Sequence, residues 1–200
     1  MSPADTRRHI LFTAMELFWL KGYNSTSIAD ILSRTQIHSG SLYHFFPSKQ
    51  DLLVGVLELY RDGIWDMLLA PAWAGIDDPI EKIFALLNAY RGHLLETDCT
   101  YGCPIGSLAL ELHEPDPKVR ELLVANFQNW TAAIEQCLAD AGVRLPAGTD
   151  RRALAEFILT TMEGAIMQAR THRDLGYFDR NVACLRDHIT MLEARTKAQV

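Results

Sequence analysis

Apolar residues recur along this 200-residue chain at intervals of three and four positions, the period of a helix that buries one face. The first such stripe runs from Ile10 to Phe18. It stops at Lys21-Gly22, a basic last turn followed by the glycine that commonly ends a helix. No segment alternates apolar and polar residues in the manner of a half-buried strand. The pattern therefore predicts an all-α protein.

Prolines, glycines and capping residues set the boundaries of the predicted helices. Pro47 ends one helix because the residue before a proline is pushed out of the helical region, and Ser48 with Asp51 resembles a capping box. A loop rich in proline, glycine and aspartate is expected from Pro71 to Pro79. The further predicted helices are about Ser27–Arg34, His38–Phe45, Ser48–Leu69, Ile80–Leu95, a short one after Pro104, one from Asp116-Pro117 to Gly142, Asp150–Arg170 and Phe178–Arg195.

The segment SGSLYHFFPSKQDLL, residues 39–53, is unusual for a protein core. Its four adjacent rings, Tyr43 to Phe46, cannot all point inward from one helix, because neighbouring helical positions face different directions. Leu42 and Phe46 lie four positions apart and are expected to anchor the inward face. The outward face then carries small residues and hydrogen-bonding rings.

Three short helices in the first quarter of the chain, the second and third joined by a tight turn, form a helix-turn-helix unit. In such a unit the last helix lies in the major groove of DNA. Small residues at its start allow close approach, and Lys49 at the start of the next helix is placed for a phosphate. The alternative is an exposed helix edge without a partner. The residues predicted to contact DNA are Thr26, Ser27, His38, Ser39, Gly40, Ser41, Tyr43, His44 and Lys49.

Residues 8–53 resemble the DNA-binding domain of the tetracycline-repressor (TetR) family in the order and spacing of their side chains. The resemblance implies a DNA-binding domain at 1–48 and a helical ligand-binding and dimerisation domain at 49–200. It further implies a transcriptional repressor that binds a palindromic operator as a homodimer and is released by a small organic or electrophilic effector. The matching positions are Ile10-Leu11, Ala14, Leu17-Phe18, Gly22-Tyr23, Thr26-Ser27, Ile31, Ile37, Gly40, Leu42-Tyr43, Phe46, Ser48-Lys49 and Leu52-Leu53.

Two positions depart from the family's pattern. Gln36 stands where the family usually has glycine in the turn, and a left-handed backbone there would cost a non-glycine residue on the order of 1 kcal/mol. The family often has a histidine directly before the final phenylalanine as a phosphate donor. Here Phe45 occupies that position and His44 precedes it.

The last two predicted helices carry a seam for helix packing. Val182, Leu185 and Ile189 are spaced three and four apart, and Gly164-Ala165 in the preceding helix permits close approach. Such residues either fill the core of one chain or pair two chains, and the family resemblance favours a four-helix bundle between two subunits. The predicted dimer interface is Phe157, Thr161, Gly164, Ala165, Val182, Leu185 and Ile189.

The middle of the chain is rich in aromatic and sulfur-containing residues. These fill cores more often than ligand sites, yet a repressor of the TetR type needs an internal cavity, and a mostly apolar pocket with a few polar groups suits a small organic effector. The predicted ligand-binding residues are Trp65, His93, Tyr101, Cys103, Phe127, Trp130 and Met162.

Cys103 carries a separate hypothesis. Pro104 is suited to the first position of a short helix, which puts Cys103 at its cap, where free N–H groups favour a thiolate. Some TetR-family members with similar cysteine-bearing loops respond to electrophiles or oxidants. The alternative is a small buried residue without reactivity.

Composition and charge narrow the function classes. With 48% hydrophobic and 22% charged residues, no signal peptide and no apolar run long enough for a membrane span, a soluble cytoplasmic protein is expected. The net charge of -6 argues against unspecific nucleic-acid binding, although residues 1–50 carry five Lys or Arg against three acidic residues. The four cysteines lack a standard zinc spacing, so neither a metal nor a cofactor is expected.

Two other function classes compete with a DNA-binding regulator. An enzyme would have to assemble Cys103, His113 and Glu111 as nucleophile, base and orienting group, and no phosphate loop, dinucleotide fingerprint or metal motif supports catalysis. A helical redox sensor would use its thiols without DNA. We expect no enzymatic activity.

Overall fold

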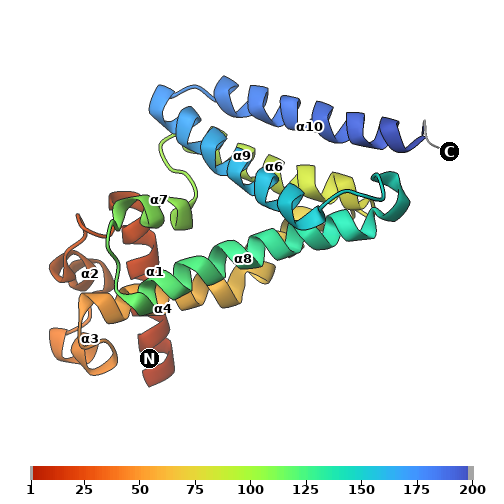
Figure 1. The fold of residues 1–200 in the computed structure, drawn as a ribbon. Coiled ribbons are helices and arrows are strands. Elements are labelled where there is room, and N and C mark those ends of the chain that lie inside the picture. Colours follow the sequence, from red (N-terminus) through yellow and green to blue (C-terminus); the bar gives the residue numbers. More distant parts are fainter. Residues whose placement is uncertain (1, 198–200) are drawn as a thin grey trace. The chain divides into compact units, whose positions relative to one another are not determined.

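The computed structural model describes residues 2–197, and every regular element in that range is a helix (Figure 1). The predicted all-α class is therefore confirmed. The elements are α1 Pro3–Lys21, α2 Ile28–Thr35, α3 Ser39–Phe45, α4 Lys49–Ile64, the π-helix η1 Trp65–Leu69, α5 Ala70–Trp73, α6 Pro79–Glu96, α7 Pro104–Glu111, α8 Pro117–Asp140, the 3₁₀-helix η2 Gly142–Arg144, α9 Arg151–His172 and α10 Gly176–Lys197.

Local capping places most helix ends within a few residues of the predicted ones. Ser27 and Asp30 form a reciprocal capping box at the start of α2, with the Asp30 N–H donating to Ser27 Oγ at 3.0 Å. Gly22 ends α1 with a φ of 84°, a conformation that glycine adopts without a steric penalty. Phe46, the residue before Pro47, is extended and ends α3.

The end of the fourth predicted helix differs from the sequence-based expectation. Pro71 was expected to begin a loop, but it lies in the first turn of α5, and the helix continues through Trp73. The five-residue π-helix η1 precedes it, with the Ala70 N–H bonded to the Trp65 carbonyl. This wider turn relieves the clash that a proline ring makes with the preceding turn of a regular α-helix.

The chain divides into two compact units, each built from two segments. The head unit takes in the chain through Gly63 together with Pro104–Asn126, and the body unit takes in Ile64–Cys103 together with the chain from Phe127 onward. The chain therefore passes between the units at three peptide bonds, one of which joins Cys103 to the start of α7. The head unit extends well beyond the 1–48 boundary expected for a DNA-binding domain.

The head unit is held together by α1, to which α2, α3 and α7 pack. Ile10, Leu11 and Phe18 of α1 are buried. Gly55 of α4 allows the closest approach, since a Cβ there would lie 2.7 Å from a Leu11 methyl group. The buried side-chain amide of Asn126 donates to the carbonyl of Leu57 at 3.0 Å and ties α8 to α4.

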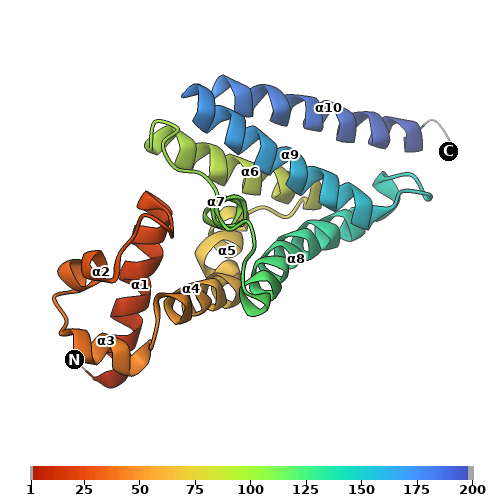
Figure 2. The same ribbon diagram turned by 60° about the vertical axis from the view of Figure 1, so that its left-hand side comes forward.

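The body unit is a packing of long helices. Figures 1 and 2 both show α9 and α10 side by side, and α6 packs against both. Ala165 of α9 and Leu185 and Ile189 of α10 are buried. No helix among residues 2–197 is both long enough and apolar enough to cross a membrane.

The turn between α2 and α3 contains the left-handed residue that the sequence raised as a possibility. Gln36 has φ 57° and ψ 27°, and its side-chain amide donates to the Ser33 carbonyl at 2.6 Å. We predict that Gln36→Gly is more stable to unfolding than Gln36→Ala by about 1 kcal/mol, because both lose the side-chain hydrogen bond and only glycine relieves the left-handed strain. Urea unfolding measures the difference. The control Gln36→Ala keeps the strain and loses the hydrogen bond, so it should lower stability; an alanine variant at least as stable as the glycine variant would contradict the prediction.

Candidate nucleic-acid interface

Helix α3 presents two chemically different faces. Leu42 and Phe46 are buried in the head unit, as predicted. Tyr43 is 49% exposed and His44 is exposed, so both rings point away from the core, which is also as predicted. The inward residues fix the orientation of the helix, and the exposed rings are free to meet a ligand.

The first turn of α3 is open on its outer side. Ser39, Gly40 and Ser41 are all exposed, and a Cβ built on Gly40 would meet no atom within 4 Å. The glycine is therefore not required by packing inside the chain. His38 is exposed at the N-cap position and its side chain makes no capping hydrogen bond.

Two predicted contact residues serve the architecture of the head. Thr26 is fully buried, and its hydroxyl lies 2.7 Å from the Gly22 carbonyl and 3.1 Å from the Leu17 carbonyl. Its side chain therefore fastens the turn after α1 and does not reach the surface. Ser27 is exposed and caps α2 together with Asp30, whose pKa is lowered to about 2, chiefly by the hydrogen bonds from Ser27.

Lys49 begins α4 beside the turn that joins α1 to α2. Its Nζ lies 4.3 Å from the centre of the Tyr23 ring, and it donates to the Asn24 carbonyl at 3.5 Å. The contact with the ring is a cation–π interaction. Burial lowers the pKa of Lys49, and the nearby Glu111 carboxylate offsets part of that effect.

Sequence reasoning missed the role of Glu111, the last residue of α7. Its carboxylate accepts hydrogen bonds from the backbone N–H groups of Tyr23 at 2.9 Å and Asn24 at 2.6 Å. The sequence placed Glu111 only in a hypothetical catalytic group. A turn after a C-terminal glycine leaves successive N–H groups without helical partners, and that was the one available signal.

Comparison with known proteins agrees with this geometry. The family description "Bacterial regulatory proteins, tetR family" matches residues 10–56, and "Transcriptional regulator LmrA/YxaF-like, C-terminal domain" matches residues 79–183, more than half of the chain. The chain belongs to the TetR family of transcriptional regulators.

Individual relatives span nearly the whole chain. The HTH-type transcriptional regulator YxaF of Bacillus subtilis is 30% identical over 173 residues, covering 86% of this chain and 89% of YxaF. The HTH-type transcriptional repressor DhaR of a Mycobacterium species is 24% identical over 178 residues, 87% of each chain. The crystal structure of a TetR-family regulator from Agrobacterium tumefaciens is 30% identical, with a TM-score of 0.77, and the match covers 96% of this chain and 99% of that one.

The predicted effector residues of this TetR-family protein include an aromatic cluster and a separate exposed ring pair. Trp130 of α8 is buried and lies edge-on to Phe127 and to Tyr90 of α6, with ring centres 6.1 and 6.0 Å apart. Trp65 is instead 55% exposed and packs edge-on against Trp73. The aromatic cluster therefore joins α6 to α8, and Trp65 belongs to a separate, exposed pair.

The other predicted effector residues differ in burial. Met162 and Cys103 are buried, and Tyr101 is half-buried. His93 is also half-buried, and burial lowers its pKa. The Cys103 thiol donates a hydrogen bond to Glu163 of α9; burial raises the pKa of Glu163, and this hydrogen bond opposes the rise.

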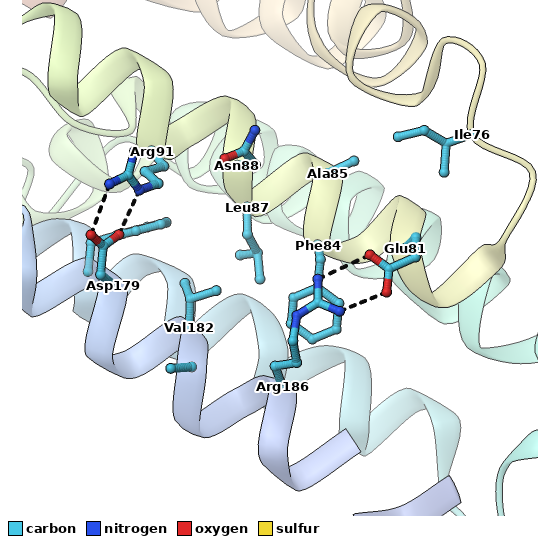
Figure 3. Close-up of a pocket in the computed structure, with 12 residues that line it drawn as sticks. Ile76, Glu81, Phe84, Ala85, Leu87, Asn88, Arg91, Asp179, Val182 and Arg186 are labelled. Carbon is cyan, nitrogen blue, oxygen red and sulfur yellow. Dashed lines mark hydrogen bonds and ion pairs between the residues drawn. The ribbon is translucent and has the colours of Figure 1, made fainter. Parts of the chain in front are cut away.

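A groove of about 700 Å³ lies between α6 and α10 (Figure 3). Its charged walls are paired: Arg91 bonds Asp179 at 2.8 Å, and Arg186 bonds Glu81 at 2.7 Å while covering the Phe84 ring at 3.7 Å. None of the predicted effector residues lines this groove. The pairs connect α6 to α10 and account for the charges there.

The predicted dimer residues differ in their exposure. Ala165, Leu185 and Ile189 are buried within the chain itself, so their side chains are not available to a second subunit. Phe157 is 50% exposed, and a Cβ on Gly164 would meet no atom within 4 Å. The remaining members are Thr161, which is half-buried, and Val182, which lines the groove between α6 and α10.

Proposed function

We propose that this TetR-family regulator is a repressor that binds a roughly palindromic operator as a homodimer and is released by a small organic or electrophilic effector. The single observation that carries the DNA-binding part is α3, with Leu42 and Phe46 buried and an open polar face outside them. The relative DhaR is named as a repressor, which supports the direction of control. Operator binding implies a cytoplasmic protein.

The proposal assigns DNA binding and effector binding to different domains. Residues 1–48 read the DNA, with Lys49 at the domain boundary adding a phosphate contact, and the remainder of residues 49–200 binds the effector and forms the dimer. We assign groove contacts to the exposed residues of α3 and its N-cap, and a phosphate contact to Lys49. We assign a contact with the DNA backbone to Ser27, at the start of α2. Thr26 contributes to DNA binding only indirectly, because its hydroxyl fixes the turn after α1. The α3 contact residues are His38, Ser39, Gly40, Ser41, Tyr43 and His44.

Exposed apolar residues on α9 support the homodimer. Phe157 and Met167 are both about half exposed, and Gly164 leaves open space between them on the same helix. A second copy of α9 can approach closely where no side chain intervenes, and large exposed apolar residues are commonly covered by a partner. Because three residues of the predicted seam are used inside the chain, this revised interface rests on the outer face of α9.

Two effector classes are consistent with the body unit. The aromatic cluster around Trp130 suits an apolar organic molecule. The Cys103 thiol, directly before α7, makes an electrophile the second candidate, since a thiol is the nucleophile that such a molecule alkylates. An enzyme is less well supported, because the Glu111 carboxylate is occupied by two backbone N–H groups. Among residues 2–197 no cluster of His, Cys, Asp or Glu could hold a metal ion. A thiol sensor that acts without DNA leaves the open face of α3 unexplained.

We predict that Lys49→Ala weakens operator binding and lowers the salt dependence by about one charge for each half-site, because one phosphate contact is lost per subunit. Gly40→Ala should also weaken binding while leaving the fold intact, since the added methyl group meets nothing inside the chain. The operator is first selected from a random DNA pool, and affinity is then measured from 50 to 200 mM salt. Gln50→Ala, an exposed change beside Lys49, is the control. Wild-type protein that enriches no sequence at low salt would overturn the proposed function.

The homodimer predicts that Gly164→Leu raises the dimer dissociation constant roughly tenfold or more, because overpacking a close contact costs about 1–3 kcal/mol. Light scattering at micromolar concentration measures the assembly. Gly92→Leu on α6 is the matched control, since Gly92 is another helical glycine with no neighbour within 4 Å of its Cβ position. A monomeric wild-type protein would refute the homodimer.

The electrophile hypothesis predicts that N-ethylmaleimide releases the wild-type protein from its operator at a lower dose than it releases Cys103→Ser. Alkylation adds bulk to a buried thiol directly before α7 and breaks its hydrogen bond to Glu163. Operator occupancy is followed during the titration. Cys184→Ser, which removes the exposed thiol on α10, should respond like the wild type. Equal doses for wild type and Cys103→Ser would leave the aromatic cluster as the effector site.

A further inference from the structure

Helix α7 is a short element that is fastened at both ends. It has eight residues, from Pro104 to Glu111, so it is about 12 Å long. Its first peptide bond, from Cys103, is a point where the chain passes from the body unit into the head unit. Its last residue is Glu111, whose carboxylate contacts the head. Any movement of the chain at Cys103 therefore has a short, stiff path to that contact.

The chain leading into α7 is held by α9 and its C-cap. Arg170 donates to the Thr100 carbonyl at 3.3 Å, and Arg173 donates to the Thr100 hydroxyl at 2.7 Å. Gly102 packs so closely that a Cβ there would lie 2.6 Å from side-chain carbons of both Arg170 and Ile166. The thiol of the next residue, Cys103, donates a hydrogen bond to the Glu163 side chain. These contacts hold residues 100–103 on α9, the helix proposed to form the dimer.

At the other end of α7, the Glu111 carboxylate binds backbone groups in the turn after α1 and not a movable side chain. The Tyr23 and Asn24 N–H groups both donate to it, at 2.9 and 2.6 Å. Gly22 makes room for the carboxylate, because a Cβ there would lie 3.0 Å from Glu111 Oε2. Three consecutive backbone positions thus surround one anionic group, an arrangement that suits a carboxylate.

We infer that Glu111 is a positioning residue that couples α7 to the turn after α1. Displacement at residues 100–103 then reaches the backbone of Tyr23 and Asn24. The inference rests on the proposed function for its consequence, which is a change in operator affinity. The same turn carries the Tyr23 ring on which Lys49 lies. Loss of the Glu111 contact therefore alters the position of the proposed phosphate contact together with that of α2.

The contact itself is tested without DNA, by hydrogen exchange of individual amides in the full-length protein. Glu111→Gln replaces one carboxylate oxygen with a donor, so the Tyr23 and Asn24 amides should exchange about tenfold faster or more. Glu114→Gln, which removes an equal charge from a 91% exposed side chain just after α7, should leave both amides unchanged. Unchanged exchange in Glu111→Gln would overturn the inference.

Coupling along α7 is tested with a strained start of the helix. Gly102→Ala places a methyl group against Arg170 and Ile166 and so displaces the chain before α7. In the absence of DNA it should accelerate exchange of the Tyr23 and Asn24 amides severalfold. If Gly102→Ala does not fold by circular dichroism, Arg173→Ala, which removes the bond to Thr100, is used in its place. If neither substitution changes the exchange rates of the Tyr23 and Asn24 amides, α7 does not transmit the displacement and the inference is wrong.

Operator affinity completes the test through a double-mutant cycle. If Glu111 transmits the displacement, Gly102→Ala should weaken operator binding about tenfold when Glu111 is present and less than about twofold in the Glu111→Gln background. Equal factors in both backgrounds would overturn the inference. Failure of the wild-type protein to bind any operator would refute the proposed function alone, because the exchange experiments judge the Glu111 contact independently.

Discussion

The insertion of α3 into the head core is the constraint on which the remaining geometry depends. Leu42 and Phe46 are buried against α1 and α4, and Gly55 leaves the space that the Phe46 ring needs: a Cβ at Gly55 would lie 3.3 Å from that ring. Because two anchors one helical turn apart fix both the depth and the rotation of a seven-residue helix, they also fix which residues face outward. The open polar face of α3 is a consequence of that packing.

The turns of the head are stabilised by groups that lie outside the helices they join. Thr26 fastens the turn after α1 through carbonyl groups, and Glu111 binds the two N–H groups that follow Gly22. Buried or half-buried backbone groups must find partners, and here one partner comes from α7, nearly ninety positions along the chain. The head is consequently not a separate three-helix piece. It is completed by chain from beyond the first portion of the body unit.

In the body unit, α9 contacts several other segments of the chain. It packs on α10, it holds the chain before α7 through Arg170 and Glu163, and a Cβ on its Gly164 would meet open space. A helix has room for such divided roles because residues three and four apart share a face while intervening residues point elsewhere. One helix of the body unit therefore carries both the face proposed for dimerisation and the contacts to the chain before α7.

The sequence by itself determined the helical class, nearly all helix boundaries, the helix-turn-helix arrangement of the first three helices and the two-faced character of α3. These depend on short-range information: apolar spacing, caps, and the backbone limits of proline and glycine. It also pointed to the left-handed backbone at Gln36. It misjudged Pro71, because a preceding π-helical turn accommodates the proline ring. Tertiary structure alone decided that Leu185 and Ile189 belong to the chain's own core, that Thr26 is buried, and that Glu111 binds the head. A spacing of three and four identifies a packing face but not the partner that covers it, and a carboxylate finds N–H groups 87 and 88 positions away only after the chain has folded.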